Sequence, residues 1–314
     1  MSSVSAVILC YNESKNIGHC LESVKGFCDI FVVDSGSTDD TVEIAGKYTS
    51  NIVVHEYQNH ASQWQWALKN LDFDTEWIIA LDSDFVVTEE LKKQINDELE
   101  SLPDNINGIY VKHNYVFGGG NVRFGGTKQY WLRIVRHKTA NADLSDLVDF
   151  RFIVPGDTRR FDSAVVEYNR YDDDISTWLN KQDKFSIRLA IEEEMRRRKL
   201  IEWGVKPDLF GNPDERFMWL RDRWLSLPLF IRPVVYFIYR YIIMLGFLDG
   251  RAGFLYHFLQ GFWLRVVIDW KIMQIRKLGL DDEGIRYFKN EILLVREGSV
   301  DTAYKKYLVS RDKS

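Results

Sequence analysis

The chain has 314 residues, of which 46% are hydrophobic, so it can bury a full core in one large domain or in one domain with an appendage. Its 41 basic and 46 acidic residues give a formal net charge of −5 at pH 7, which argues against a general nucleic-acid-binding protein. The cysteines, Cys10, Cys20 and Cys28, lack metal-site spacing and are interpreted as small buried residues in a reducing compartment. The start, MSSVSAVILCYNE, has no basic region before its short apolar run, so no signal peptide is expected and we place the N-terminal part in the cytoplasm.

Strand and helix patterns alternate through the first hundred residues. Short apolar runs predict strands, and apolar residues that recur every three to four positions between them predict helices. The expected strands cover residues 4–10, 27–34, 52–54 and 77–82, with helices at 17–24, 38–48 and 61–71 between them and another from Thr88. Because parallel neighbours need crossover helices, these repeated units predict an α/β fold with a doubly wound, mainly parallel sheet.

Carboxylates follow successive strands of this predicted sheet. Glu13 follows the first strand, Asp34 ends the second, and Asp82 and Asp84 follow the apolar run of the fourth. Parallel strands end at one edge, so together these residues favour a nucleotide site, although a turn-forming acid is the alternative for any single one. Asp82 and Asp84 are candidate ligands for Mg²⁺ or Mn²⁺ bridging to a diphosphate, the alternative being a strand end followed by a helix cap.

Three motifs carry a resemblance to a known family. The strings AVILCYNESKNI, VVDSGSTDDT and WIIALDSDFVV, in this order, resemble the nucleotide-sugar-binding half of family 2 glycosyltransferases, which are inverting enzymes with the GT-A fold. The resemblance implies that Tyr11, Glu13 and Asp34 hold the nucleotide base. It also implies that Asp82 lies near the ribose and that Asp84 binds Mn²⁺ or Mg²⁺ on the diphosphate.

The second half is expected to supply the acceptor site and the catalytic base. Residues 108–117 and 130–137 predict strands. The resemblance extends here to the lipopolysaccharide-core and capsule glucosyltransferase-like branch, in which a strand arginine lies near the donor phosphates. Arg133 matches that arginine, the alternative being a solvated strand residue.

An inverting transfer needs a carboxylate to accept the proton of the acceptor hydroxyl. In many relatives the carboxylate that acts as base is a glutamate. When Gly156 is aligned with the equivalent position of those relatives, Phe150 occupies the place of that glutamate in this chain. Asp149, one residue away, is therefore the first candidate for the base, and Asp146 is the second.

From about residue 172 the pattern becomes helical. We therefore predict a GT-A catalytic domain at residues 1–171 and a helical extension at 172–314. Within the helix predicted at 175–200, each residue of Glu192–Glu194 precedes an arginine by four positions, which we interpret as a solvated surface. The stretch 217–272 is rich in aromatic residues but interrupted by arginines, and no charge-free run reaches the roughly 18 to 20 residues of a spanning helix.

For the stretch 217–272 we expect an interfacial helix pair that lies in the plane of the membrane surface, with arginines beside Trp and Tyr at the headgroups. A soluble aromatic core or an oligomer interface is the alternative, and a homo-oligomer is left open. The stretch also resembles the C-terminal part of the same glycosyltransferase branch, in words such as GNPDERFMWLRDRW.

These features favour a metal-dependent inverting glycosyltransferase that is peripheral on the cytoplasmic face of the membrane. It would transfer one sugar from a nucleotide diphosphate donor, with a UDP-sugar favoured, to a lipid-linked or cell-surface glycan precursor. Single addition is expected because the Gln-x-x-Arg-Trp motif of processive synthases is missing. One alternative is a catalytically silent protein that binds a nucleotide sugar or a lipid. The other is a nucleotidyltransferase, but the chain lacks the Gly-rich basic loop after the first strand that would favour it.

Overall fold

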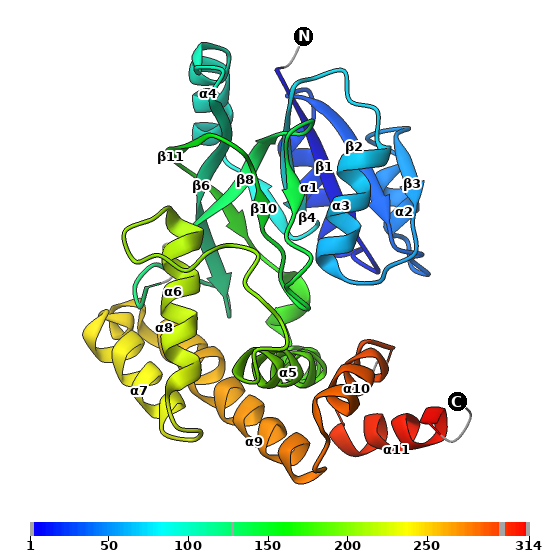
Figure 1. Cartoon of the computed structure of the whole chain (residues 1–314). Helices are drawn as coiled ribbons and strands as arrows, with labels where there is room; N and C mark the ends of the chain where they lie inside the picture. The colour runs from blue at the N-terminus through cyan, green and yellow to red at the C-terminus, as the bar shows by residue number, and fades with distance from the viewer. Residues whose placement is uncertain (1–2, 127–128, 295–298, 312–314) are drawn as a thin grey trace.

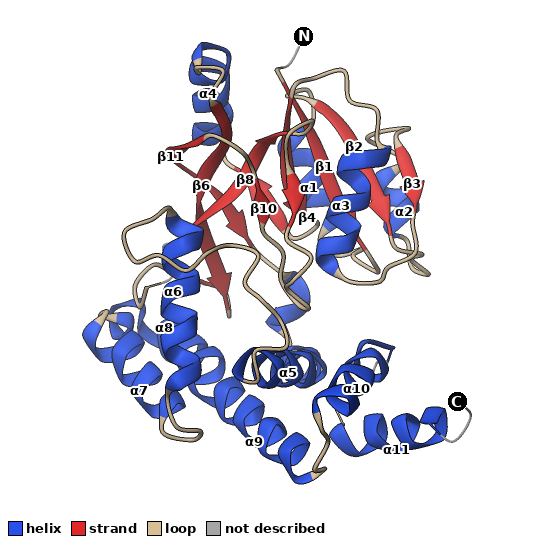
Figure 2. Ribbon diagram, in the orientation of Figure 1, coloured by secondary structure: helices blue, strands red, loops and turns tan. Residues whose placement is uncertain are grey.

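The computed structural model of the chain describes residues 3–126, 129–294 and 299–311. A large sheet with flanking helices forms the upper part of the molecule in Figures 1 and 2, and the helices from α5 onward gather beneath it. The strands are β1 (Val4–Cys10), β2 (Asp29–Asp34), β3 (Ile52–Val54), β4 (Trp77–Asp82), β5 (Phe85–Val87), β6 (Ile106–Phe117), β7 (Gly120–Val122), β8 (Gln129–Arg136), β9 (Asn141–Ala142), β10 (Phe152–Ile153) and β11 (Asp157–Glu167).

The main sheet has the strand order β3-β2-β1-β4-β8-β6-β11-β5, with β7 paired to β6. Strands β3, β2, β1 and β4 are parallel to their neighbours in this order. Strand β8 is antiparallel to both β4 and β6, whereas β11 is parallel to β6. The predicted parallel arrangement is thus confirmed for the first four strands, and the sheet becomes mixed beyond β4.

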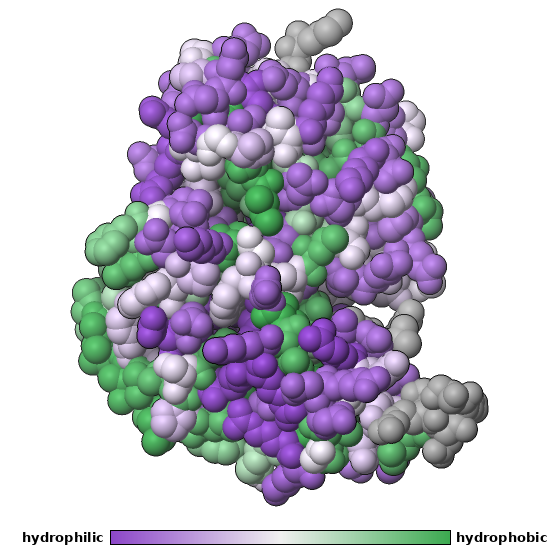
Figure 3. All heavy atoms as spheres, viewed as in Figure 1, coloured by the Kyte–Doolittle hydropathy of each residue, from purple (hydrophilic) through white to green (hydrophobic). Residues whose placement is uncertain are grey.

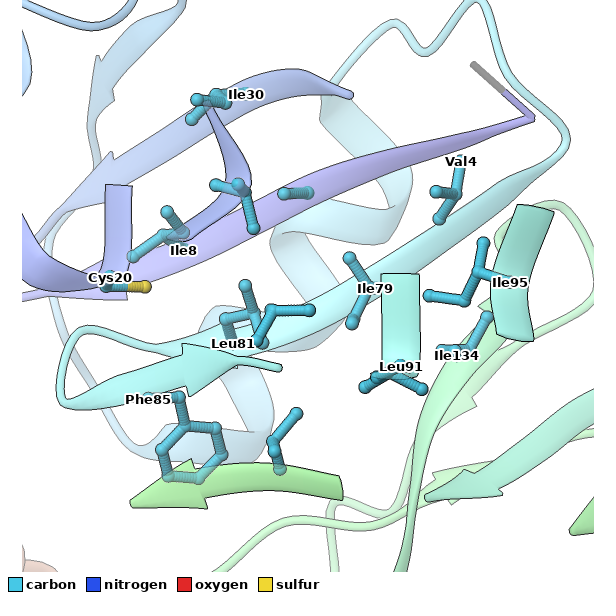
Figure 4. Close-up of a cluster of buried hydrophobic side chains, with 14 of the residues drawn as sticks. Val4, Ile8, Cys20, Ile30, Ile79, Leu81, Phe85, Leu91, Ile95 and Ile134 are labelled. Carbon is cyan, nitrogen blue, oxygen red and sulfur yellow. The ribbon is translucent and has the colours of Figure 1, made fainter. Parts of the chain in front are cut away.

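Alternating side chains of the sheet enter two separate cores. On one face, Val4 and Ile8 of β1 and Ile79 of β4 pack with α1 and α4, in the cluster drawn in Figure 4. On the other face, Val7 and Leu9 of β1 pack against α3. Because successive side chains of a strand point to opposite faces, a strand covered by helices on both faces is mostly apolar, and every residue of β1 is buried. Its one polar side chain, Ser5, is hydrogen-bonded to the Thr75 hydroxyl (2.8 Å).

The helices of the first part are α1 (Ile17–Val24), α2 (Thr41–Ala45), α3 (His60–Asn70) and α4 (Glu89–Glu98). The later helices are α5 (Ile175–Arg197), α6 (Pro213–Ser226), α7 (Arg232–Ile238), α8 (Gly250–Tyr256), α9 (Leu264–Lys277), α10 (Asp282–Leu294) and α11 (Val300–Arg311). π-Helical turns at Tyr239–Ile243 and His257–Trp263 continue α7 and α8. Whether residues 1–171 and 172–314 are separate domains stays a prediction.

Local capping explains where two of these helices begin. Asp174 accepts hydrogen bonds from the backbone amides of Ser176 and Thr177 at the start of α5. At the start of α6, the Asn212 side chain accepts from the Glu215 amide while the Glu215 carboxylate accepts from the Asn212 amide. Such reciprocal bonds satisfy amides that have no partner within the helix.

Three consecutive glutamates of α5 join α5 to three other helices. Glu192 pairs with Arg221 of α6 (2.5 Å), Glu193 with Arg232 of α7 (2.6 Å) and Glu194 with Arg276 of α9 (2.8 Å). These glutamates are only 1%, 4% and 3% exposed. The prediction that they lie on a solvated surface is therefore wrong, because the i,i+4 pattern does not reveal which face of a helix is covered by its neighbours.

The arginines of the 217–272 stretch also differ from the expectation. Arg232 is 1% exposed and pairs with Asp269 as well as Glu193, and Arg240 is 6% exposed and donates to the Gly125 carbonyl (2.7 Å). They cannot reach lipid headgroups, because each is held by a partner inside the protein. The expectation of headgroup-level arginines is thus wrong for these two, whereas Arg251 is exposed.

Crossing a membrane requires a certain length and apolar composition of the described helices. None of them alone combines the length and the apolar composition that crossing a bilayer requires. The bent pair Arg232–Ile243 and Gly246–Lys277 meets both requirements when taken together, with a bend of 70° between its halves.

We expect Arg232→Met to destabilise the protein by about 3 to 5 kcal/mol, because it leaves the carboxylates of Glu193 and Asp269 buried without their cation. Urea unfolding at neutral pH measures the change. Lys47→Met is the matched control, because it removes the cation of the exposed Lys47–Glu43 pair. Equal unfolding midpoints for the two variants would show that the buried pair contributes no more than the exposed one.

Candidate active site

The ends of three parallel strands meet at one edge of the sheet. Cys10 of β1 lies opposite Asp34 of β2, and Leu9 of β1 lies opposite Asp82 of β4. Asp34 and Asp82 therefore flank the end of β1, and Glu13 lies in the loop that follows it. The edge arrangement predicted from the sequence is present.

Asp34 shapes the turn after β2. Its carboxylate accepts hydrogen bonds from the amides of Gly36 (2.9 Å) and Ser37 (2.8 Å) and from the Ser37 hydroxyl, and 1% of the residue is exposed. The Asn12 amide donates to the same hydroxyl (2.8 Å), which joins the loop after β1 to this turn. Tyr11, in that loop, is 43% exposed. Asp34 thus holds the turn, and Tyr11 presents an open ring beside it.

Asp82 lies between a histidine and an arginine. Its Oδ1 lies 3.0 Å from Nε2 of His60 on α3, and its Oδ2 accepts from Nη2 of Arg133 on β8 at 3.3 Å. Burial raises the pKa of Asp82, but the charges of His60 and Arg133 outweigh that effect and lower the pKa to about 2. Asp82 is therefore ionised at neutral pH and held in one position.

Arg133 is enclosed by aromatic rings. Its guanidinium carbon lies 4.8 Å from the ring centre of Phe85, 4.7 Å from Trp131 and 4.8 Å from Phe150, and 2% of the residue is exposed. Two of its donors, Nε and Nη1, have no hydrogen-bond partner within the described ranges. The interpretation of Arg133 as a solvated strand residue is therefore wrong, and its unpaired donors suit an anionic ligand.

Asp84 lies among other carboxylates. Strand β5 runs antiparallel to β11 and places Glu167 opposite Phe85, next to Asp84. The Tyr168 amide donates to the Asp84 carbonyl (2.9 Å), which fixes this proximity. Burial and the charges of Glu167 and Asp82 raise the pKa of Asp84 well above its usual range. A bound cation would remove this repulsion.

A second group of residues connects this edge of the sheet to α5. The side-chain amide of Asn16 donates to Glu13 (2.6 Å) and to the side-chain oxygen of Asn169 (3.1 Å). Nearby, the ammonium of Lys181 on α5 lies 3.8 Å from the carboxylate of Asp172. Burial alone would lower the pKa of Lys181, but Asp172 and the other carboxylates of the site raise it, so the ammonium stays charged.

The residues present fit a divalent cation with few protein ligands. Within residues 3–126, 129–294 and 299–311, no three His, Cys, Asp or Glu side chains are arranged to hold a metal. Asp84 still offers a carboxylate in a strongly negative environment, which favours a hard cation such as Mg²⁺ or Mn²⁺. Such an ion would take its remaining oxygen ligands from a bound molecule, and a diphosphate can supply them.

Comparisons with known proteins identify this part of the chain. Residues 5–152, which contain Asp34, Asp82, Asp84 and Arg133, match the model of the family Glycosyl transferase family 2. The chain carries a family 2 glycosyltransferase domain.

The enzyme is similar to two curated proteins, one over most of this chain and the other over about a third of it. It is 23% identical to the lipopolysaccharide core biosynthesis glycosyltransferase LpsC of Rhizobium meliloti (strain 1021), over 82% of this chain and 89% of that protein. It is 36% identical to the uncharacterized glycosyltransferase RC0292 of Rickettsia conorii, over 35% of each chain. Together with the family match, these relatives show that the protein is a glycosyltransferase.

Among solved structures, residues 1–349 of TarS from S. aureus align over 90% of this chain and 93% of that one. The TM-score of this alignment is 0.40 and the sequence identity is 16%.

The two candidate bases have different surroundings in the enzyme. Asp146 is 2% exposed and is bound by Arg151, by Arg196 (2.9 Å) and by Arg221 (3.3 Å). Asp149 is exposed and directly precedes Phe150, whose ring covers the guanidinium of Arg133. The structure therefore places Asp149 beside the site and Asp146 inside an ion network.

Several residues of the site were not singled out from the sequence. They are His60, Glu167, Asp172 and Lys181, together with Asn16 as a link between loops. Asn16 lies within the first of the three motifs, but His60, Glu167, Asp172 and Lys181 lie outside all of them, and Lys181 joins the site from α5, about a hundred residues after the Asp82 strand end. Only the folded chain shows that these residues are neighbours.

We expect Asp172→Asn to stabilise the enzyme by about 1 to 3 kcal/mol at pH 7.5, because burial raises the pKa of Asp172 to about 6. A raised carboxyl pKa opposes folding once the group is ionised, so this contribution is absent below about pH 4 and complete above about pH 6. The advantage of the variant should therefore appear as the pH rises through this window.

Urea unfolding from about pH 4 to 8 in metal-free buffer measures this change. Asp173→Asn, which alters the exposed neighbouring carboxylate, should keep the wild-type pH dependence. A loss of stability in Asp172→Asn at pH 7.5 would mean that attraction to Lys181 outweighs the cost of burial.

Proposed function

We propose that the enzyme transfers one sugar, with inversion, from a nucleotide diphosphate sugar to a lipid-linked or cell-surface glycan precursor. The observation that carries this proposal is the position of Asp84 beside the fixed carboxylate of Asp82 and the enclosed guanidinium of Arg133. A UDP-sugar is the favoured donor. The name of LpsC supports an acceptor that belongs to a glycan of the cell envelope.

The loops after β1 and β2 would bind the nucleoside. Tyr11 presents an exposed ring for the base, and Glu13 and Asp34 belong to the two loops that are joined at Ser37. Asp82, held by His60 and Arg133, lies at the position proposed for the ribose. These residues bind and orient the donor and take no part in bond breaking.

The diphosphate would lie beside Asp84 and Arg133. A Mn²⁺ or Mg²⁺ ion held by Asp84 would stabilise the negative charge that develops on the leaving diphosphate. The unpaired Nε and Nη1 atoms of Arg133 can donate to phosphate oxygens, and the surrounding rings hold the guanidinium plane in place.

Asp149 would accept the proton of the acceptor hydroxyl. Its side chain is exposed to an entering acceptor, and Phe150 links it to the surroundings of Arg133. Asp146 is bound by three arginines, which cover its carboxylate oxygens. A base must be free to contact the hydroxyl, so this geometry favours Asp149.

The most direct test of this function is a screen of nucleotide sugars with the purified full chain. Nucleoside diphosphate release would be measured with and without Mn²⁺ or Mg²⁺, with a cell-envelope lipid extract as the acceptor. Release that depends on metal and acceptor is the expected result. Release of pyrophosphate would instead indicate a nucleotidyltransferase.

We expect Asp84→Asn to lower the transfer rate by about 100-fold or more, because stabilisation of the leaving group by the metal supplies several kcal/mol. EDTA should have a comparable effect on the wild type. Asp97→Asn, which alters an exposed carboxylate on α4, should keep full activity. Full wild-type activity in EDTA would contradict the assignment of Asp84 as a metal ligand.

We expect Asp149→Asn to abolish transfer while leaving the affinity for nucleoside diphosphate nearly unchanged, because proton acceptance matters mainly in the transition state. Calorimetry measures the affinity, and the donor assay measures turnover. Asp146→Asn should instead lower the unfolding midpoint, because it weakens a buried ion network. Near-normal turnover in Asp149→Asn would require another base.

A further inference from the structure

An apolar face covers one side of the helical part of the enzyme. We define it as the outward side chains of residues 227–258, which comprise α7, the turn after it and α8. Its exposed members are Leu227, Phe230, Ile231, Val234, Val235, Ile238, Tyr239, Ile242, Ile243, Met244, Leu245, Phe247, Leu248, Phe254, Leu255 and Phe258. Figure 3 shows hydrophobic residues along the lower left margin, where α7 lies in Figure 1.

The charged side chains of the same segment point mostly into the protein. Arg232 pairs with Glu193 and Asp269, and Arg240 donates to the Gly125 carbonyl. Asp249 accepts from the backbone amides of Arg123 and Phe124, both at 2.8 Å. Of the charged residues between 227 and 258, only Arg251 is exposed. This distribution is the reverse of that expected at a water-exposed surface.

An environment of hydrocarbon accounts for this reversal. In lipid, ionisable side chains turn to the protein interior and find partners there, while apolar side chains face outward. The exposed charge also fits a membrane, because the segment presents Arg251 and no exposed carboxylate to anionic headgroups. A second copy of the chain fits less well, because specific protein interfaces normally include paired polar groups and this face offers few.

The dimensions limit how deeply the segment can enter a bilayer. Residues 232–243 form a helical arm of about 18 Å, compared with about 30 Å for the hydrocarbon core. The second arm leaves the first at a bend of 70°. The first arm is therefore long enough for one leaflet and too short to cross both.

Backbone contacts attach this segment to the catalytic sheet. The Gly125 amide, in the loop between β7 and β8, donates to the Met244 carbonyl (2.8 Å). A Cβ atom at Gly125 or at Gly246 would meet the imidazole of His257 at 2.1 Å or 2.5 Å, so both glycines allow this close packing. Since β8 carries Arg133, whatever holds the apolar face also orients the donor site.

We propose that the apolar face inserts into one leaflet of a phospholipid bilayer and holds the catalytic sheet in a defined orientation to the membrane surface. Hydrophobic insertion provides the attachment, because the arginines at positions 232 and 240 are committed inside the protein. This attachment is independent of the sugar transferred, so failure of the donor assay would leave it intact.

The experiment is flotation of the purified full chain with vesicles of phosphatidylcholine and phosphatidylglycerol. We expect the wild type to float with the vesicles and to remain bound at about 1 M salt, where interactions between exposed charges are screened. Ile243→Glu combined with Leu248→Glu should reduce the bound fraction at least about tenfold, because each places a charge in hydrocarbon. Phe210→Glu, at a 92% exposed position outside the face, is the matched control and should float like the wild type.

Two further measurements make the outcome decisive. Urea unfolding midpoints equal to that of the wild type show that the variants are folded, and Ile243→Ser with Leu248→Ser should give a smaller loss of binding in the same direction. The proposal fails if the wild type does not float, if salt alone releases it, or if the glutamate variant floats normally. A lipid-free dimer that these substitutions dissociate, without vesicle binding by the wild type, would assign the face to a second copy of the chain.

Discussion

The helical part of the enzyme depends on the pairing of three buried glutamates. Glu192, Glu193 and Glu194 follow one another on α5, so their side chains leave the helix in different directions and contact arginines of α6, α7 and α9. A buried carboxylate without a cation is strongly destabilising, so the three helices can pack on α5 only in positions that bring those arginines into contact. The hydrophobic cluster around Ile187, Ile191 and Ile272 fills the space between them.

The same network reaches the active site through one loop. Arg196 and Arg221 bind Asp146 as well as Glu192, and Asp146 lies three residues before Asp149. The position of Asp149 and of the Phe150 ring over Arg133 is therefore tied to the packing of α5 and α6. Loss of Arg196 or Arg221 is therefore expected to alter the position of the loop that carries Asp149 as well as the stability of the enzyme.

The donor site combines fixed cations with an excess of carboxylates. Asp82 contacts His60 and pairs with Arg133, whereas Asp84 lies beside Glu167 and forms no ion pair among the residues that the structure describes. This asymmetry gives the two neighbouring aspartates different electrostatic surroundings, which is the basis of the different roles proposed for them. Lys181 adds a positive charge from α5, which links the helical part to the chemistry at the sheet edge.

The sequence by itself determined the first four strands, their helices and the edge at which Asp34, Asp82 and Asp84 gather. These features follow from local periodicity and from the crossover connection that parallel strands require. Both can be recognised from short stretches of the sequence. The three motifs likewise gave the family, because each lies within one strand and the loop after it.

Only the tertiary structure decided which charged residues are buried. The i,i+4 pattern of α5 predicted that its glutamates face solvent, and the arginines at positions 232 and 240 were predicted to lie at lipid headgroups. In the structure, partners distant in sequence enclose both groups of side chains. The tertiary structure also brings Glu167 and Lys181 to the site. It likewise decides that Asp146 is buried in an ion network whereas Asp149 is exposed. A sequence pattern shows which residues share a face of a helix or strand, but what covers that face depends on elements that lie far along the chain.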